Sequence, residues 1–283
     1  MYDGYSWDGE QFVYNPFSVI KFLKEGIFDN YWFETGTPAF LVEILRHYRV
    51  SGDTIAYKEV DSSFFNKFDI RYGIDVYPLL FQTGYSTIKK VQYEDTSVYY
   101  TLNYPNQEVQ RSFVQNLIEV YTFKPPSVIN TATIQLEKAL KNRNIRVFEE
   151  QLNVLFSDIS HHLFPFEKKK KDAQRELQEF MAWEGYFQTI IYLVLQYIGI
   201  RIQCEIIKHK GRLDAVIEVT DYIYIMEYKL EDAEVALKQI KEQKYAHSFL
   251  NTTKEVILMG VAFDRAKREV KKIEWEVWDK RLK

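Results

Sequence analysis

The spacing of hydrophobic residues in the first third of the chain predicts helices that lead into a pair of strands. Residues 15–26 have helical spacing, with a proline in the first turn and a glycine at the end, and residues 38–50 predict a second helix. Between 77 and 102, two runs of period two are separated by the polar segment QYEDT, which predicts paired strands. Helical spacing returns over residues 106–123. Helices followed by a hairpin in this order suit a winged-helix-like unit.

A change of character follows the consecutive prolines Pro125 and Pro126, which remove backbone donors and disfavour helix in the preceding residue. Beyond them, long helical patterns give way to short runs rich in Ile, Val and Tyr. The sequence predicts helices at 133–155, 172–197 and 233–250, and strands at 201–209, 211–219, 221–230, 255–264 and 273–278. The continuous apolar run at 255–264 is typical of a buried parallel strand. An α/β (mixed) fold is therefore expected, with a helical, winged-helix-like N-terminal region followed by a mixed β-sheet flanked by helices.

Composition narrows the class of protein. Among the 283 residues, 46% are hydrophobic and 27% charged, as in globular proteins. The formal net charge of -3 argues against a protein that coats nucleic acid by bulk electrostatics, although it allows a local basic groove. The single cysteine, Cys204, excludes an internal disulfide and suits a reducing compartment, so a cytoplasmic location is expected. No stretch is long and apolar enough to span a membrane, and none has the pattern of a signal peptide.

Three ionisable residues interrupt predicted strands that should be buried. Asp214 lies within GRLDAVIEV, and Glu227 and Lys229 lie within YIYIMEYKL. Burying such groups costs several kcal/mol unless they are paired or bind a metal. Glu227 and Lys229 are two residues apart and project from the same face of one strand, and Asp214 joins them if the two strands pair. The alternative is a structural ion-pair cluster at the edge of the sheet.

Oxygen ligands of this kind suit Mg²⁺ or Mn²⁺, which bind through one or two carboxylates together with waters and substrate phosphate oxygens. A nearby lysine can orient or help deprotonate an attacking water and offset charge that develops on phosphorus. The three residues therefore predict a metal-dependent phosphodiesterase site.

The order Asp, strand and turn, Glu-X-Lys, helix, strand resembles the PD-(D/E)XK nuclease superfamily. The resemblance implies a restriction-endonuclease-like core and a nuclease that hydrolyses nucleic acid, with DNA favoured. It implies Asp214, Glu227, Lys229 and Gln239 as catalytic residues, and Asp214, Glu227 and Glu184 as metal ligands. The proline that precedes the aspartate in that superfamily is replaced by Leu213.

The whole chain also resembles a group of bacterial proteins in which an AAA-ATPase-like region precedes such a nuclease domain. The resemblance rests on segments 2–7, 14–23, 30–41, 78–89, 211–219, 222–230 and 236–246. It implies that residues 1–125 are the C-terminal part of an AAA-ATPase-like module, that 126–160 are a helical connector, and that 161–283 are the nuclease-like domain. No GxxxxGK[ST] motif is present, so we expect no ATP site in this chain and a truncated piece of the larger arrangement.

Two other hypotheses stay open at this point. The nuclease-like fold can serve as a non-catalytic module that binds nucleic acid or a protein partner. The N-terminal part can be the remnant of a nucleotide switch that governed the nuclease. The sequence leaves the oligomeric state undecided, with a homo-oligomer as one option.

Overall fold

The computed structural model describes residues 1–34, 58–66, 76–157, 159, 173–208, 211–230 and 232–280. The chain divides into two compact units, Met1–Val120 and Tyr121–Lys283. The helix predicted at 38–50 and the predicted boundary at 160/161 lie outside the described residues. The assignment of residues 1–125, 126–160 and 161–283 to three domains stays a prediction. Within the described part of the chain, no helix is both long and apolar enough to cross a membrane.

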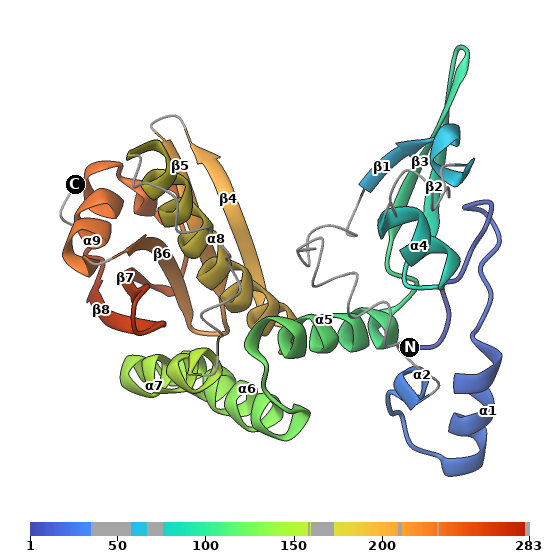
Figure 1. The fold of residues 1–283 in the computed structure, drawn as a ribbon, viewed down its shortest axis with the longest axis horizontal. Helices are drawn as coiled ribbons and strands as arrows, with labels where there is room; N and C mark the ends of the chain where they lie inside the picture. The colour runs from blue at the N-terminus through green and yellow to red at the C-terminus, as the bar shows by residue number, and fades with distance from the viewer. Residues whose placement is uncertain are drawn as a thin grey trace. The chain divides into compact units, whose positions relative to one another are not determined.

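The first unit combines short helices with a small sheet (Figure 1). Its three strands are antiparallel neighbours in the order β1-β3-β2. Its elements are α1 (Pro16–Glu25), α2 (Tyr31–Glu34), β1 (Lys58–Asp61), η2 (Ser62–Asn66), α4 (Val76–Gln82), β2 (Thr87–Glu94), β3 (Ser97–Asn103) and most of α5 (Gln107–Thr122). The predicted helix at 15–26 is confirmed: the Asn15 side chain accepts from the backbone N–H groups of Phe17 and Ser18, and Gly26 ends α1 with a φ of 70°.

The predicted strand that starts near Tyr77 is wrong over its first part, because Val76–Gln82 forms α4. Leu79 and Leu80 are both buried. In a strand with one buried face, neighbouring residues point to opposite sides, so only one of the two would be buried. A run this short does not distinguish period two from helical spacing. The hairpin itself is confirmed, since β2 and β3 pair around a turn at Asp95. The winged-helix-like description stays a prediction.

The second unit contains a five-stranded sheet in the order β4-β5-β6-β7-β8. Neighbours are antiparallel except β6 and β7, which are parallel, so the sheet is mixed and the predicted α/β (mixed) class is confirmed. Its elements are α6 (Pro126–Lys141), α7 (Ile145–Phe156), α8 (Ala173–Tyr197), β4 (Arg201–Lys208), β5 (Gly211–Glu218), β6 (Tyr222–Leu230), α9 (Ala233–Glu242), η5 (Tyr245–Phe249), β7 (Glu255–Asp264) and β8 (Glu269–Val277).

Three predicted elements of this unit differ from the structure. The helix expected at 233–250 ends at Glu242, because Lys244 adopts a φ of 54°, and a separate 3-10 helix, η5, follows. The single helix expected at 133–155 is two helices, because Arg143 adopts a φ of 51° and Asn144 caps α7 by accepting from the N–H of Val147. The strand expected at 273–278 begins earlier, at Glu269. Its first residues include lysines and lack apolar periodicity, so the sequence pattern does not reveal that they pair with β7.

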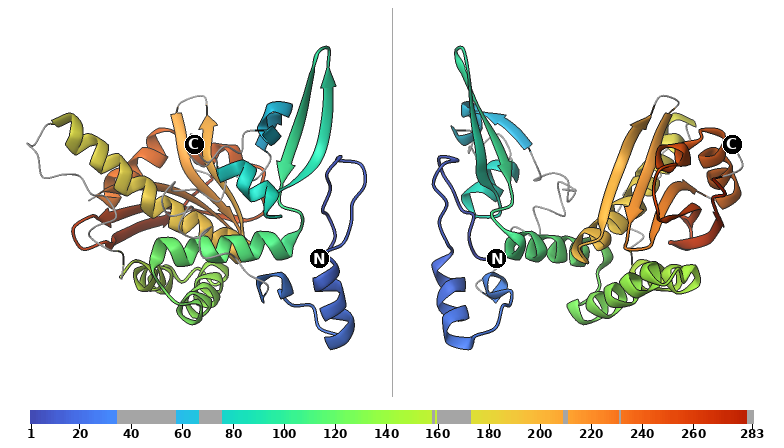
Figure 2. Two further views of the ribbon diagram at one scale, coloured as in Figure 1. Left: turned by 45° about the vertical axis from the view of Figure 1, so that its right-hand side comes forward. Right: turned by 180° about the vertical axis from the view of Figure 1, so that it is seen from behind.

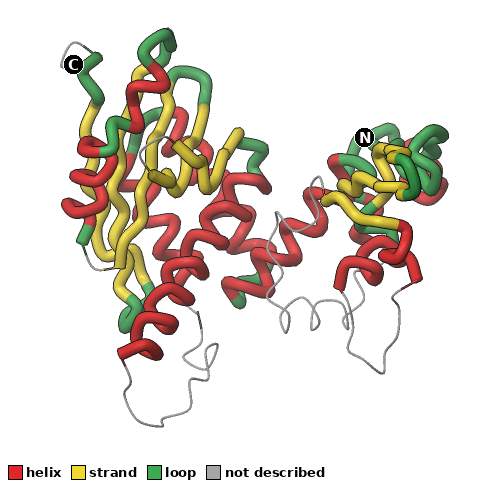
Figure 3. Tube along the Cα trace, turned by 90° about the horizontal axis from the view of Figure 1, so that it is seen from above, coloured by secondary structure: helices red, strands yellow, loops and turns green. Residues whose placement is uncertain are grey.

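Helices cover both faces of the five-stranded sheet (Figures 2 and 3). On one face, α9 packs over a core cluster that includes Ile225 and Leu258. On the other face, Phe187 of α8 stacks on Phe263 with ring centroids 4.6 Å apart, and Tyr228 also stacks on Phe263. Because successive residues of a strand alternate between faces, Glu227 and Lys229 share the α9 face with Ile225.

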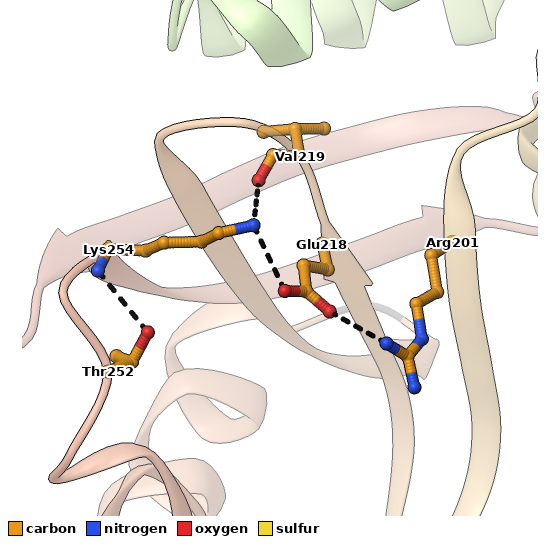
Figure 4. Close-up of polar contacts among 5 residues, drawn as sticks. All are labelled: Arg201, Glu218, Val219, Thr252 and Lys254. Carbon is orange, nitrogen blue, oxygen red and sulfur yellow. Dashed lines mark hydrogen bonds and ion pairs between the residues drawn. The ribbon is translucent and has the colours of Figure 1, made fainter.

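An ion-pair network ties three strand ends together (Figure 4). Lys254, just before β7, donates to the Glu218 carboxylate at 3.0 Å and to the Val219 carbonyl at 2.6 Å. Arg201, at the start of β4, approaches the other oxygen of Glu218 at 3.5 Å. Glu218 is four residues beyond Asp214, which is about 13 Å along β5. This carboxylate is therefore structural and lies away from the candidate site.

Candidate active site

The strands that carry Asp214, Glu227 and Lys229 are neighbours in the sheet. β5 and β6 are antiparallel, with Ala215 opposite Met226, so the pairing that the sequence analysis required is confirmed. At the next position the Asp214 carboxylate accepts the backbone N–H of Tyr228 at 2.8 Å. Asp214 is thereby held against the backbone between Glu227 and Lys229.

The Glu227 side chain is 2% exposed and has two oxygens in different environments. Oε1 accepts from Nζ of Lys229 at 3.3 Å and from Nε2 of Gln239. Oε2 is buried and has no hydrogen-bond partner among the residues that the structure describes. An unsatisfied acceptor costs about 1–3 kcal/mol, and more when it carries charge. The oxygen therefore provides a position for a donor or a cation that is not part of the chain.

Burial raises the pKa of Glu227 to about 7, and the negative charge of Asp214 acts in the same direction. The Lys229 ammonium and the backbone N–H of Asp214 oppose the shift without cancelling it. The two carboxylates repel each other when both are ionised. A cation between them would stabilise the ionised form of both.

Replacement of Glu227 by Gln is expected to change how stability depends on pH. A pKa raised from 4.5 to about 7 means that the folded state holds its proton after the unfolded state has lost it. Stability therefore falls as pH rises through this window, and above it the penalty levels off at about 3 kcal/mol. Glu227→Gln should thus raise the free energy of unfolding at pH 8 by up to about 3 kcal/mol, with little gain at pH 4. Denaturant unfolding at both pH values, with a metal chelator present, measures the difference.

Glu218→Gln is the matched control, because the hydrogen bond from Lys254 lowers the pKa of Glu218. Its loss should weaken stability at pH 8 rather than improve it. Parallel pH profiles for Glu227→Gln and the unaltered chain would contradict the assignment of the buried charge.

Gln239 reaches Glu227 from α9. This helix begins after Asp232, whose side chain accepts from the N–H groups of Glu234 and Val235. Its apolar side packs on the sheet through Ala233, Ala236 and Ile240, all of which are buried. Gln239, the residue before Ile240, lies beside the Glu227 carboxylate.

Gly260 of β7 pairs with Glu227 and lets α9 approach the sheet closely. A Cβ at Gly260 would lie 2.2 Å from the carbonyl oxygen of Ala233 and 2.6 Å from the backbone nitrogen of Leu237. The missing side chain sets the distance between α9 and β6. Nothing in the sequence pattern singled out this glycine.

Tyr245, which falls within the helix predicted at 233–250, is a second neighbour of Glu227 that the sequence analysis did not single out. Its ring is buried, and its pKa is raised by burial and by the charge of Glu227, while a hydrogen bond with the Gln239 side chain lowers it. The chain leaves α9 through Lys244 in a left-handed conformation, with φ at 54°, which breaks helical spacing between Gln239 and Tyr245. For this reason the relation of the two residues was not visible in the sequence.

Glu184 of α8 lies within electrostatic reach of the same group. Burial raises its pKa, the Lys229 ammonium lowers it, and the charge of Asp214 raises it. Gln188, one turn along α8, donates to its carboxylate at 3.5 Å. No three His, Cys, Asp or Glu side chains come close enough to form a ready metal cluster in the described part of the chain, so the ligand role of Glu184 stays a prediction.

The residues present nevertheless fit a hard divalent cation. Mg²⁺ keeps several waters and needs only one or two carboxylates from the protein. Asp214 and Glu227 supply such a pair, and the unpartnered Oε2 of Glu227 is an oxygen of the required kind. A structural ion-pair cluster alone would leave this oxygen unexplained.

Comparison with known proteins locates a family within the second unit. Residues 182–273 match the model of the PD-(D/E)XK nuclease superfamily, which identifies a domain of that superfamily in this segment. The segment contains Glu184, Asp214, Glu227, Lys229 and Gln239.

A much longer protein matches most of the chain. It is named "Uncharacterized protein in vnfD 5'region", from Azotobacter chroococcum mcd 1, and it is 31% identical over 272 residues. These cover 95% of this chain and 50% of the relative, so the chain spans about half of that protein's length. No solved structure gives a significant match.

Proposed function

We propose that the PD-(D/E)XK domain at residues 182–273 is a metal-dependent nuclease that hydrolyses phosphodiester bonds of nucleic acid, with DNA as the favoured substrate. The observation that supports this most is the state of Glu227. Its carboxylate is buried next to Asp214, one oxygen is held by Lys229 and Gln239, and the other has no partner among the described residues.

In this proposal Asp214 and Glu227 hold Mg²⁺ or Mn²⁺, and Glu184 contributes through water or directly. When bound, the ion would polarise a phosphoryl oxygen and lower the pKa of a coordinated water. Lys229 lies 3.3 Å from Glu227 and presents a compact positive charge beside the reacting phosphate, where it orients the water and offsets developing charge. Gln239 donates to Oε1 of Glu227, which would leave Oε2 available to hold the ion.

The test is cleavage of a panel that contains single- and double-stranded DNA and RNA. Each substrate is incubated with chelator, Mg²⁺, Mn²⁺ or Ca²⁺, and binding of each metal is measured separately by calorimetry. We expect cleavage of at least one DNA substrate with Mg²⁺ or Mn²⁺ and none with chelator. If the chain neither binds these ions nor cuts any substrate, the nuclease proposal fails.

The competing function is a non-catalytic module that binds nucleic acid or a protein partner through the nuclease-like fold. The contact between Lys229 and Glu227 favours it, because an ion pair of this kind can be purely structural. Such a module would bind nucleic acid equally well after substitution of either residue. The calorimetric experiment separates the two functions, since only the nuclease requires the metal.

The setting of the domain is a further part of the proposal. We place it in a larger bacterial protein with an AAA-ATPase-like region and in the cytoplasm. The support is the segment-wise resemblance described above and the length of the Azotobacter relative, which is about twice that of the matched region. Control of cleavage by a nucleotide switch is tested by comparing this chain with an extended protein, with and without ATP. Equal rates would rule out the switch.

A further inference from the structure

A pocket of about 440 Å³ opens at the C-terminal end of α9, on a different side of the helix from Gln239. Its volume lies within the range of about 300–1,000 Å³ that is usual for small-molecule sites. Ile240, Ala246 and Leu258 line it with apolar side chains of the core cluster. Gln239 and Ile240 are adjacent on α9 and point about 100° apart, which separates this pocket from the Glu227 site.

Two aromatic rings lie at the pocket. The indole of Trp278 and the imidazole of His247 have centroids 5.8 Å apart and planes inclined by 36°. Trp278 is fixed in place, because its backbone N–H donates to the Val256 carbonyl and its side chain packs on the core cluster. A fixed indole next to an apolar lining offers a surface on which a flat ring can stack.

The two lysines that line the pocket differ in whether they form an ion pair. Lys241 pairs with Glu276 at 2.6 Å, whereas Lys244 makes no ion pair with any residue in the described ranges. Lys244 also has a φ of 54°, a left-handed conformation that costs a non-glycine residue about 1–3 kcal/mol. Glycine would make the same turn without strain. The Lys244 side chain therefore lies at the pocket on a backbone that glycine would adopt with less strain.

We propose that this pocket binds one nucleotide unit, with the base against Trp278 and the phosphate at Lys244. A simple anion is disfavoured by the carboxylates of Glu276 and Asp279, which also line the pocket. A purely apolar ligand would leave Lys244 unused. A nucleotide combines a flat ring, amino or hydroxyl groups that donate to carboxylates, and an anionic end.

The test measures binding by calorimetry in metal-free buffer with chelator, so that it does not depend on the proposed hydrolysis. The probes are the four 5′-mononucleotides, adenosine as a ligand without phosphate, and a twelve-nucleotide single strand of DNA. We expect Lys244→Gly to weaken binding of at least one mononucleotide by about threefold to tenfold, and Trp278→Ala to weaken it by roughly fivefold to a hundredfold. Lys238→Ala, an equal loss of charge from α9 outside the pocket, should leave affinity unchanged.

Lys244→Gly keeps the left-handed turn, so it tests the site even if Trp278→Ala unfolds the chain. If the substitutions weaken binding of the single strand as well, the ligand is a nucleotide unit of a strand. If they affect mononucleotides alone, it is a free nucleotide. Both results support the pocket. Absence of mononucleotide binding, equal affinity for adenosine and its monophosphate, or affinity that is indifferent to Lys244→Gly would overturn it.

Discussion

Asp214→Asn is expected to reduce metal-dependent cleavage roughly a thousandfold or more, because it removes a full negative charge from the position proposed for the ion without changing the size of the side chain. The amide oxygen can still accept the N–H of Tyr228, so the local contact at 2.8 Å is preserved. Initial rates of cleavage under saturating Mg²⁺, together with calorimetric affinity for the ion, measure the effect. Glu227→Gln and Lys229→Met should give losses of similar order, since residues that act as one unit are not additive.

Glu218→Gln is the control for this series, because Glu218 is a carboxylate of the same strand that is occupied by Lys254 and Arg201 (Figure 4). It should retain cleavage within about twofold, as expected for a partly exposed ion pair. A properly folded Asp214→Asn protein that cuts at the rate of the unaltered chain would refute the proposed role of the carboxylate pair. Equal nucleic-acid binding by all variants, with no cleavage by any, would instead support the non-catalytic module.

Gly260→Ala is expected to lower the free energy of unfolding by about 2–4 kcal/mol, because the added methyl group meets backbone atoms that cannot rotate away. The new Cβ would lie 2.2 Å and 2.6 Å from atoms of α9, so either the helix or β7 must shift. A shift of α9 carries Gln239 away from Glu227, so cleavage should fall more than stability alone predicts. Denaturant unfolding and cleavage at a temperature where the variant is fully folded separate the two effects.

Gly185→Ala provides the same chemical change at an open position. A Cβ at this residue of α8 meets nothing within 4 Å, and alanine is favoured over glycine in a helix by about 0.5–1 kcal/mol. The control should therefore be neutral or stabilised. A Gly260→Ala protein as stable as the unaltered chain would show that α9 is not held against the sheet as described.

Covalent geometry made part of the site predictable. Glu227 and Lys229 share a face because they are two residues apart on a strand, and the 3.3 Å contact between them follows. Asp214 required a hairpin, and the closely spaced β5 and β6 form one. The mixed sheet followed from the order of short apolar runs and helices.

The remaining parts depend on contacts between segments distant in sequence. Gly260 matters only because α9 lies over it, and Tyr245 lies near Gln239 only because Lys244 turns the chain. A short run without strong periodicity gave the strand predicted where α4 forms. The single helix predicted over α6 and α7 missed the break at Arg143 and the cap at Asn144. Local spacing does not decide such cases because packing determines which face is buried.

From the parallel pairing of β6 with β7 we expect an order of events during folding. β5 and β6 are joined by a short turn and can pair early, whereas β7 reaches β6 only after the chain has passed through α9 and η5. Because α9 supplies Gln239 and Glu227 is buried in the folded chain, we expect this environment to form only when the crossover has docked. We therefore expect the arrangement around Glu227 to be completed late. A nascent chain that has not yet added β7 would carry Glu227 without the burial that raises its pKa.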